Sequence, residues 1–525
     1  MTVDSTLPLD ALAALIEQAG GIPGRPLPLI NGRTAVVPNA ALVALAAHPA
    51  VQHLALDRGV AGTLERTGAA VYATQVRQAF GVDGAGIGVA VIDSGITPWH
   101  DDLADPANPG SQRVVQFVDL VGGATASDEY GHGTHVAGII AGNGFDSNGG
   151  RAGIAPGAHL IVLKVLNGAG QGRISDVIAA FDYVVAHRTD LNIRIANLSI
   201  GAGVYESFHL DPLTVAARRV VEAGVVVVAA AGNLGRRVDG SAQYGRVTAP
   251  GNAPWVLTVG ASSHMGTIDR SDDTVAAFSS RGPTAIDRAP KPDLVAPGVG
   301  IESLSAPGSY LYNSRTAYLL NGTVAAATMP YLSLSGTSMA APVVSGAVAL
   351  MLQANPALTP NAVKAILQYT SQTSNAYDLM TQGTGFLNAR GAVELAAFFA
   401  SPTTNYPTAT SWSRQLIWGK RRLWGGRIYP NVAAWAKSVP WGSPTSGSDA
   451  LMAWTVLAIG GLGGGGQPQP VWGVDQGESI VWGTSDDDSL VWGTADDDSL
   501  VWGTGDDESL VWGTGCRDSS CDVVW

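Results

Sequence analysis

Five short runs of apolar residues constrain the fold of this 525-residue chain more than any other feature. They cover residues 86–92, 160–165, 193–200, 225–231 and 255–259. Helical stretches separate them, as at 175–188 and 211–223. Strands that are apolar on both faces and alternate with helices form buried parallel sheets in α/β domains. The sequence therefore predicts an α/β body with a mainly parallel sheet, to which residues 338–354 and 361–368 add helices.

Composition divides the chain into a body and a tail. Hydrophobic residues make up 46% of the chain and charged residues 14%, which excludes disorder of the whole chain. The net charge is −13, but residues 471–525 alone hold 13 acidic side chains and one basic one. The body is thus nearly neutral, and a generally basic nucleic-acid-binding protein is excluded. Tryptophan is also uneven, since 12 of 14 lie after residue 400.

We divide the chain into four parts. Residues 1–65 mix helix and strand, residues 66–400 hold the α/β body, and residues 401–470 are rich in Pro, Ser, Gly and Trp and are interpreted as a linker. Residues 471–525 repeat ten residues close to VWGTxDDDSL. Each repeat predicts a short strand plus a turn, stacked in a small β-solenoid, and a flexible acidic tail is the equal alternative. A surface-association or substrate-binding role fits such a module, and no metal is assigned to its acidic rows.

Signals for the compartment are sparse. Cys516 and Cys521 are the two cysteines, and either a short disulfide, which implies an oxidising compartment, or two free thiols fits them. The N-terminus shows no basic start followed by an apolar stretch, so no signal peptide is visible. The apolar stretch at 450–462 is too short and too rich in glycine to span a bilayer.

Three segments of the body offer the chemistry of an activated serine. Asp93 ends an apolar strand, where the carboxyl edge of a parallel sheet places ligands and catalytic groups. His132 stands in the small-residue segment GHGTHVAG, and Ser338 in SGTSMAAP at the start of a helix. Alone, each has a plainer interpretation as a cap or a structural residue. Together they supply a nucleophile, a base that takes its proton and a carboxylate that orients the base.

At these residues the chain resembles the subtilisin-like serine peptidases, the subtilases. The motifs are VIDSG around Asp93, HGTHVAG around His132 and SGTSMAAP around Ser338, and the resemblance covers roughly residues 70–395. It implies a three-layer α/β/α fold in which Asp93 orients the imidazole, His132 acts as base and then acid, and Ser338 is the nucleophile. It also implies that His135 is structural. Hydrolysis of peptide bonds needs no cofactor in this scheme.

The resemblance extends to residues that would bind the substrate. Asn233 ends the family motif AAGN and corresponds to the donor that stabilises the developing oxyanion, together with the backbone N–H of Ser338. An extended peptide would pair with the strand at 197–201. The walls of the main specificity pocket would be Ser199, Ile200 and Gly201 on one side and Ala230, Ala231 and Gly232 on the other.

Two further expectations concern calcium and the N-terminus. Asp102 in the segment HDDL resembles a family calcium ligand, and the loop at 142–150 offers Asp146 and Asn148. Because this loop departs from the family pattern, acids exposed to solvent are the favoured interpretation, and structural calcium stays open. Residues 1–65 resemble part of an inhibitory propeptide, with the first strand missing or diverged. Cleavage between residues 57 and 72 is the hypothesis, and an extension that is never cleaved is its alternative.

The sequence thus predicts a serine endopeptidase that acts on proteins or peptides and is inhibited by its own N-terminal segment. A secreted or cell-surface location follows from the resemblance and the late cysteine pair. The alternative from another class is a binding or adhesion protein that uses the peptidase domain as a scaffold. The complete set of Asp93, His132, Ser338 and Asn233 argues against it, because a scaffold has no need of all four.

Overall fold

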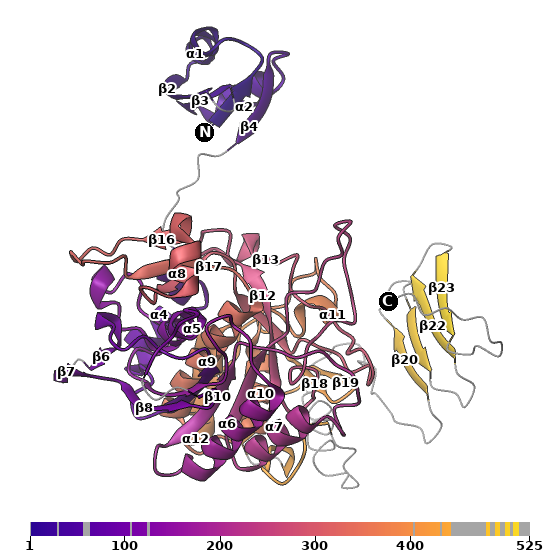
Figure 1. Cartoon of the computed structure of the whole chain (residues 1–525). Coiled ribbons are helices and arrows are strands. Elements are labelled where there is room, and N and C mark those ends of the chain that lie inside the picture. The colour runs from indigo at the N-terminus through magenta and orange to yellow at the C-terminus, as the bar shows by residue number, and fades with distance from the viewer. Residues whose placement is uncertain are drawn as a thin grey trace, which may run out of the picture. The chain divides into compact units, whose positions relative to one another are not determined.

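The computed structural model describes residues 2–28, 31–55, 63–105, 108–122, 126–402, 405–430 and 433–442, and four short strands between residues 479 and 513. By contacts the chain divides into two compact units, Met1–Trp454 and Thr455–Trp525 (Figure 1). The apolar stretch at 450–462 and both cysteines lie outside the described residues.

An eight-stranded sheet forms the centre of the larger unit. Its order is β13-β12-β11-β10-β5-β9-β8, with β14 paired to β12, and β12 and β13 form the antiparallel pair in an otherwise parallel sheet. The strands are β5 (Gly88–Asp93), β8 (Val114–Asp119), β9 (His159–Lys164), β10 (Ile193–Leu198), β11 (Val226–Ala230), β12 (Leu257–Ser263), β13 (Thr274–Val275) and β14 (Leu294–Pro297). The predicted parallel sheet is confirmed, since five of these strands fall on the five apolar runs.

Two layers of helices enclose this sheet. The helices α5 (His132–Ala141) and α9 (Thr337–Ala354) pack on each other and on the sheet, and α6 (Ile174–His187) and α7 (Pro212–Glu222) form a second packed pair. Around them lie α3 (Thr63–Ala70), α4 (Ala73–Phe80), α10 (Pro360–Thr370) and α12 (Ala389–Ala400). The result is the expected three-layer α/β/α fold (Figure 1). Among the described helices, α9 alone is long and apolar enough to cross a membrane, but 83% of it is buried in the core.

The first 55 residues form a small α+β unit with its own core. Its sheet has the order β2-β3-β1-β4 and carries the helices α1 (Leu9–Gln18) and α2 (Leu42–Ala46). The strands are β1 (Thr2–Ser5), β2 (Ile22–Leu27), β3 (Gly32–Val36) and β4 (Val51–Ala55). A first strand is present, since β1 lies between β3 and β4 and buries Val3 completely, so of the two expected alternatives a diverged strand remains. The helix α2 ends at Ala46, and Pro49 disfavours helix at His48.

The described residues of 405–442 belong to the α/β body and do not form the predicted linker. The strands β18 (Gln415–Trp418) and β19 (Arg421–Trp424) make an antiparallel hairpin. Four tryptophans of this segment are buried in the same core as the sheet, namely Trp412, Trp418, Trp435 and Trp441. The prediction failed because the Gly- and Pro-rich composition hid the apolar surface that these scattered tryptophans contribute.

A buried charge network joins this hairpin to the sheet. Asp293 accepts from Lys291 Nζ at 2.8 Å and pairs with Lys364 Nζ at 2.9 Å, and Gln368 donates to it at 2.8 Å. Burial alone would raise the pKa of Asp293, but the two lysines hold it below its usual value. The Oε1 of Gln368 accepts from the backbone N–H of Ile417 at 2.8 Å, so the strand β18 completes the network.

Four strands recur in the repeat region at the predicted period of ten residues. They are β20 (Ser479–Gly483), β21 (Ser489–Gly493), β22 (Ser499–Thr504) and β23 (Glu508–Gly513). β20 pairs with β21 and β22 with β23, both antiparallel (Figure 1). These two antiparallel pairs differ from the stacked units of the predicted solenoid. The central residues of the acidic rows lie outside the described residues.

The two faces of the β18–β19 hairpin give a direct test of this packing. Trp418 is 4% exposed and Trp424 is 56% exposed. We expect Trp418→Ala to lower the free energy of unfolding by about 3–5 kcal/mol, because it opens a large cavity in the core. Trp424→Ala, the control, should change it by about 0.5 kcal/mol or less. Urea denaturation of both variants measures the difference, and equal values would contradict an integral hairpin.

Candidate active site

Asp93 and His132 meet at the carboxyl edge of the sheet. Asp93 is the last residue of β5 and is completely buried, and His132 is the first residue of α5. Asp93 Oδ1 lies 2.7 Å from His132 Nδ1 and also accepts from the backbone N–H of Ser94 at 2.8 Å. This contact places the imidazole proton on Nδ1, which leaves Nε2 as the nitrogen that takes a proton.

The surroundings of His132 set its basicity. Burial would lower the pKa of His132, but the charge and hydrogen bond of Asp93 and the charge of Asp128 raise it above the usual value. The raised pKa makes the imidazole a stronger base at Nε2. It acts as a base only at a pH high enough to keep the imidazole neutral.

Asp128 holds the N-terminus of α5 and therefore the position of His132. Its Oδ1 accepts from Ser94 Oγ and from the N–H of Gly131, both at 2.7 Å. Its Oδ2 accepts from the N–H and the hydroxyl of Thr134, at 2.8 and 2.6 Å. Sequence analysis missed this residue because it lies four residues before the helix and not at the N-cap position, which Gly131 occupies.

Gly131 shows how tightly the turn before His132 is built. Its φ of 94° is in the left-handed region, and a Cβ there would lie 2.3 Å from Ser309 Oγ. Only glycine fits both the conformation and the space, so the glycine of the motif is a geometric requirement of this turn.

Ser338 is the second residue of α9, where helical N–H groups lack partners within the helix. Its Oγ donates to the backbone carbonyl of Ser199 at 2.7 Å, and the Oγ of Ser199 donates to the carbonyl of Ser338 at the same distance. The end of β10 is thereby tied to the start of α9. A half-buried hydroxyl at a helix N-terminus has positive backbone groups beside it, which suits a site where negative charge develops.

Asn233 follows β11 and is oriented by the same helix. Its Oδ1 accepts from the N–H and the hydroxyl of Thr337, at 2.9 and 3.0 Å. Because the oxygen is held in this way, Nδ2 points away from Thr337. Among the described residues, no group accepts a hydrogen bond from Nδ2. The hydroxyl of Thr337 also accepts from the N–H of Gly232 at 3.1 Å. Thr337 therefore positions Asn233, a role that sequence analysis did not assign.

The predicted pocket walls lie at the ends of β10 and β11, beside these residues. Ser199, Ala230 and Ala231 are buried, Ile200 and Gly232 are half-buried, and Gly201 is exposed. A Cβ on Gly201 would lie 2.4 Å from Thr248 Oγ1, and one on Gly232 would lie 3.0 Å from Ser280 Oγ and from Thr248 Cγ2. At both glycines the neighbouring side chains therefore leave no room for a Cβ.

His135 is placed away from this chemistry. It is completely buried, and its Nε2 contacts the carbonyls of Ile301 and Leu332 at 3.1 and 2.9 Å. Burial and the neighbouring His132 lower its pKa to about 3, so it stays neutral. Its contacts hold together α5, β15 (Ile301–Leu304) and β17 (Tyr331–Leu334).

The suggested calcium ligands are buried, which overturns the expectation of acids exposed to solvent. Asp102 and Asp146 lie with His100 in one cluster, and Asn148 is exposed. Asp102 Oδ1 accepts from the N–H of Asp146 and Oδ2 from the hydroxyl of Tyr331, both at 2.8 Å. Burial raises the pKa of Asp102, and burial together with Asp102 raises that of Asp146 to about 6.

This cluster does not fit a calcium ion. Calcium takes six to eight oxygen ligands. Both carboxylate oxygens of Asp102 already accept hydrogen bonds, and His100 Nδ1 accepts from the N–H of Asp102 at 3.1 Å. Asp146 Oδ1 is buried without a hydrogen-bond partner among the described residues, and Asp146 Oδ2 lies 3.9 Å from His100 Nδ1. The cluster thus offers two carboxylates, fewer oxygen ligands than calcium takes. A guanidinium supplies positive charge nearby, because Arg113 donates to the backbone carbonyls of Asp102 and Ala158 at 3.1 and 2.9 Å.

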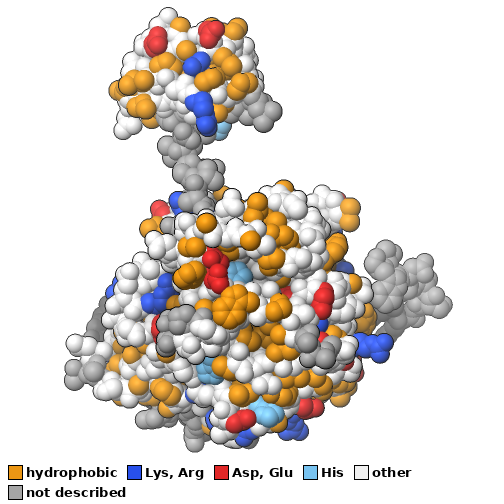
Figure 2. All heavy atoms as spheres, turned by 60° about the vertical axis from the view of Figure 1, so that its left-hand side comes forward, with side chains coloured by type: hydrophobic (Ala, Val, Ile, Leu, Met, Phe, Trp, Pro, Cys, Tyr) orange, Lys and Arg blue, Asp and Glu red, His pale blue; other side chains and the backbone are white. Residues whose placement is uncertain are grey.

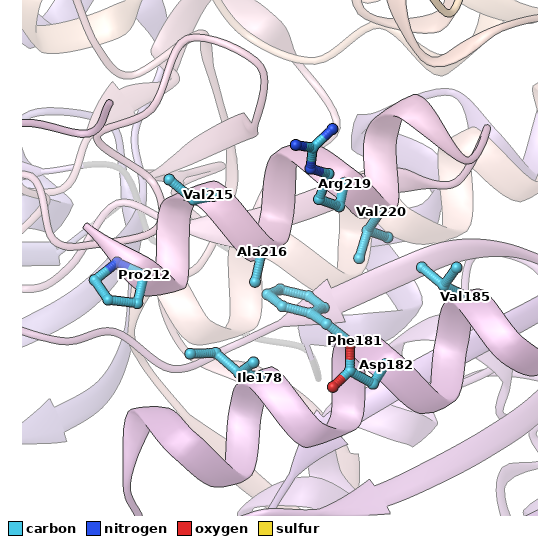
Figure 3. A pocket seen from close by; sticks show the side chains of 9 residues that line it. All are labelled: Ile178, Phe181, Asp182, Val185, Pro212, Val215, Ala216, Arg219 and Val220. Atoms are coloured by element: carbon cyan, nitrogen blue, oxygen red, sulfur yellow. The ribbon is translucent and has the colours of Figure 1, made fainter. Parts of the chain in front are cut away.

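An apolar groove of about 330 Å³ lies elsewhere, between α6 and α7 (Figure 3). Phe181, Val185 and Val215 line it, with Asp182 and Arg219 beside them. It contains none of the predicted site residues, so it is not the active site.

Comparison with known proteins decides the family. The profile of the subtilase family matches residues 84–392, well over half of the chain. The chain belongs to the subtilase family. Serine protease AprX of Bacillus subtilis (strain 168) is 37% identical over 350 residues, 65% of this chain and 74% of the relative. Subtilisin DY of Bacillus licheniformis is 33% identical over 318 residues, 60% of this chain and 94% of the relative.

A solved structure described as a cold adapted subtilisin-like serine proteinase is 29% identical, with a TM-score of 0.41. The matched region covers 64% of this chain and 93% of the solved structure's chain. The subtilase profile spans all four predicted motifs, VIDSG, HGTHVAG, AAGN and SGTSMAAP. This subtilase therefore has the activity that its family implies, the hydrolysis of peptide bonds by a serine peptidase without a cofactor.

The link between Asp128 and His132 is testable through the pH dependence of hydrolysis. We expect Asp128→Asn to shift the acid limb of kcat/KM to lower pH, because it removes a charge that raises the pKa of His132. Rates should also fall, by up to about 100-fold, as the start of α5 loosens.

Ser94→Ala is the matched control for this test. It removes one hydrogen bond to Asp128 without changing the charge, so the rate should fall while the acid limb stays in place. An unchanged limb in Asp128→Asn would contradict the electrostatic role of Asp128.

Proposed function

We propose that Ser338 is the nucleophile of this serine endopeptidase, His132 its general base and acid, and Asp93 the residue that orients the imidazole. The observation that carries the proposal is the buried 2.7 Å contact between Asp93 Oδ1 and His132 Nδ1. It fixes the tautomer in which Nε2 takes a proton. The motif order Asp, His, Ser in a subtilase supports the same roles.

Catalysis then proceeds in two halves. The Oγ of Ser338 gives up its hydrogen bond to the Ser199 carbonyl, transfers its proton to His132 Nε2 and bonds to the carbonyl carbon of the substrate. The imidazolium returns that proton to the leaving amine as the peptide C–N bond breaks, which leaves an ester on Ser338. Water, activated by His132, hydrolyses the ester and restores the serine.

The oxyanion of both steps would be stabilised by Asn233 and a backbone amide. The side-chain Nδ2 of Asn233 is available because Thr337 holds the oxygen end. The N–H of Ser338, in the first turn of α9, is the second donor. These donors are in place before the reaction, so they cost little reorganisation when the charge develops.

Substrate would bind as an added strand. In this proposal an extended peptide pairs with residues 199–201, and its acyl residue lies between the walls of residues 199–201 and 230–232. The small residues of those walls predict a roomy apolar pocket. The alternative of an adhesion protein that uses the domain as a scaffold has no support in the comparisons.

We also propose that the N-terminal α+β unit is an inhibitory propeptide. It has its own hydrophobic core of Val3, Leu12, Ile16, Ala35 and Leu45, and α3 packs on the catalytic body from Thr63 onward. Thr67 and Ala70 of α3 are buried. A cut between residues 57 and 62 would therefore separate the N-terminal segment from the α/β body and leave α3 in place. This narrows the cleavage window that the sequence predicts, residues 57–72.

The remaining assignments extend this proposal. The catalytic domain would run from residue 66 to Gly442, and the repeats after residue 471 would serve association with a surface or a substrate. Secretion or display at the cell surface is proposed from the resemblance and from Cys516 and Cys521. A relative named Major intracellular serine protease, 37% identical over 274 residues, shows that family membership alone does not fix the compartment.

Replacing Ser338 tests both parts of the proposal. We expect Ser338→Ala to abolish casein hydrolysis and to keep its original N-terminus, because the same serine would cut the propeptide. The control is Ser175→Ala, since Ser175 is likewise the second residue of a helix, α6, outside the site. It should hydrolyse casein like the wild type and be processed.

Asn233→Ala should lower kcat by about 10²–10³-fold with little change in KM. Casein hydrolysis by Ser338→Ala at the wild-type rate would contradict the nucleophile. An active wild-type protein that still begins at Met1 or Thr2 would contradict the propeptide alone.

A further inference from the structure

The segment between β15 and β17, residues 305–330, docks beside His132 and has no part in the mechanism above. Its helix α8 (Tyr310–Ser314) begins against the turn that precedes the histidine. The N–H groups of Tyr310 and Leu311 donate to the carbonyls of Glu129 and Tyr130, at 2.8 and 3.0 Å. The segment is therefore attached to the backbone two and three residues before the catalytic base.

The attachment stacks two aromatic rings next to His132. The rings of Tyr130 and Tyr310 are nearly parallel, with centroids 5.9 Å apart and an angle of 8° between their planes. The ring of Tyr130 lies 6.3 Å from the imidazole of His132. Tyr310 is 57% exposed, so the stack offers an open apolar surface beside the reacting atoms.

The base of this stack is rigid. A Cβ on Gly170 would lie 2.6–2.8 Å from three carbons of the Tyr130 ring, so the ring lies directly on the loop after β9. Glu129 is fixed by Lys164, whose Nζ donates to its Oε2 at 2.7 Å and to the carbonyl of Ser94 at 2.5 Å. These contacts hold Tyr130 in place, while Tyr310 adds the exposed ring.

The sheet order places the stack on the side of His132 opposite the proposed specificity pocket. That pocket lies at the ends of β10 and β11, whereas Gly170 follows β9, and β5 with Asp93 lies between them. Successive side chains of an extended peptide point to opposite sides. A substrate whose acyl residue enters the pocket therefore directs the preceding side chain toward β9 and the two tyrosines.

We propose that the Tyr130–Tyr310 stack is a specificity determinant that binds a large apolar or aromatic side chain at the substrate residue preceding the acyl residue. Tyrosine supplies a large rigid apolar surface that tolerates partial exposure, which suits an open site of this kind. Figure 2 shows hydrophobic side chains gathered on the upper part of the domain. Figure 1 places α8 and β16 (Leu319–Leu320) at the same height. The proposal rests on His132 being the catalytic base.

Peptide profiling of three variants tests the stack. Tyr310→Ala removes the exposed ring, Tyr310→Phe keeps it, and Tyr318→Ala removes a tyrosine of the same segment that is 55% exposed and takes no part in the stack. Each is assayed on two peptides that differ only in carrying Phe or Gly before the acyl residue, and thermal unfolding checks the fold.

We expect Tyr310→Ala to lower kcat/KM for the Phe peptide about 10-fold or more, mainly through KM, and to change the Gly peptide less than about 2-fold. Tyr310→Phe and Tyr318→Ala should behave like the wild type. An equal loss on both peptides carried by kcat would show that Tyr310 only positions His132, and no loss would show that the stack binds nothing. Either result overturns the proposal, whereas failure of the wild type to cleave both peptides would instead contradict the catalytic assignment.

Discussion

The site depends on one buried interaction, the hydrogen bond between Asp93 and His132. Asp93 is completely buried, and its Oδ1 has two partners, the imidazole and the N–H of Ser94, while its Oδ2 has no hydrogen-bond partner among the described residues. The two residues come from different elements, the end of β5 and the start of α5. The parallel pairing of β5 with β9 and β10 fixes the first, and Asp128 with Gly131 fixes the second. The chemistry thus requires the sheet edge and the helix N-terminus to keep their relative positions.

The helix α9 fixes the position of the nucleophile in the same way. Fifteen of its eighteen residues are buried, and its first turn carries Ser338 and the Thr337 groups that hold Asn233. Reciprocal contacts tie Ser338 to Ser199 at the end of β10. A reactive hydroxyl at the end of a rigid core helix moves little, which suits a site whose parts must meet within a fraction of an ångström.

Much of the fold was predictable from sequence because runs of apolar residues indicate buried strands. The five runs became β5, β9, β10, β11 and β12, and the strand-end position of Asp93 followed from them. The strand β8 was not predicted, since it lies at the sheet edge and its burial is only partial. The hairpin at residues 415–424 was missed for a different reason, because its tryptophans are buried by tertiary packing that no local period reveals.

The residues of the site also divide into those that the sequence identified and those that it did not. The residues that react stand in long motifs and could be named from sequence. The residues that position them were not named: Thr337 holds Asn233, which lies 104 residues earlier in the chain, and Asp128 joins Ser94 of the first motif to the turn before His132. The stacked Tyr130 and Tyr310 are 180 residues apart and belong to this second class. Calcium was left open by the sequence, and the cluster of His100, Asp102 and Asp146 offers two carboxylates where calcium takes six to eight oxygen ligands.

Covalent labelling tests the central claim most directly. A fluorophosphonate reacts with a serine only when an adjacent base removes its proton, so peptide mapping by mass spectrometry identifies the activated residue. The account predicts a single adduct on Ser338 in the processed protein, and loss of that adduct in His132→Ala with the fold intact. An adduct on another serine, or labelling of Ser338 that persists in His132→Ala, would contradict it.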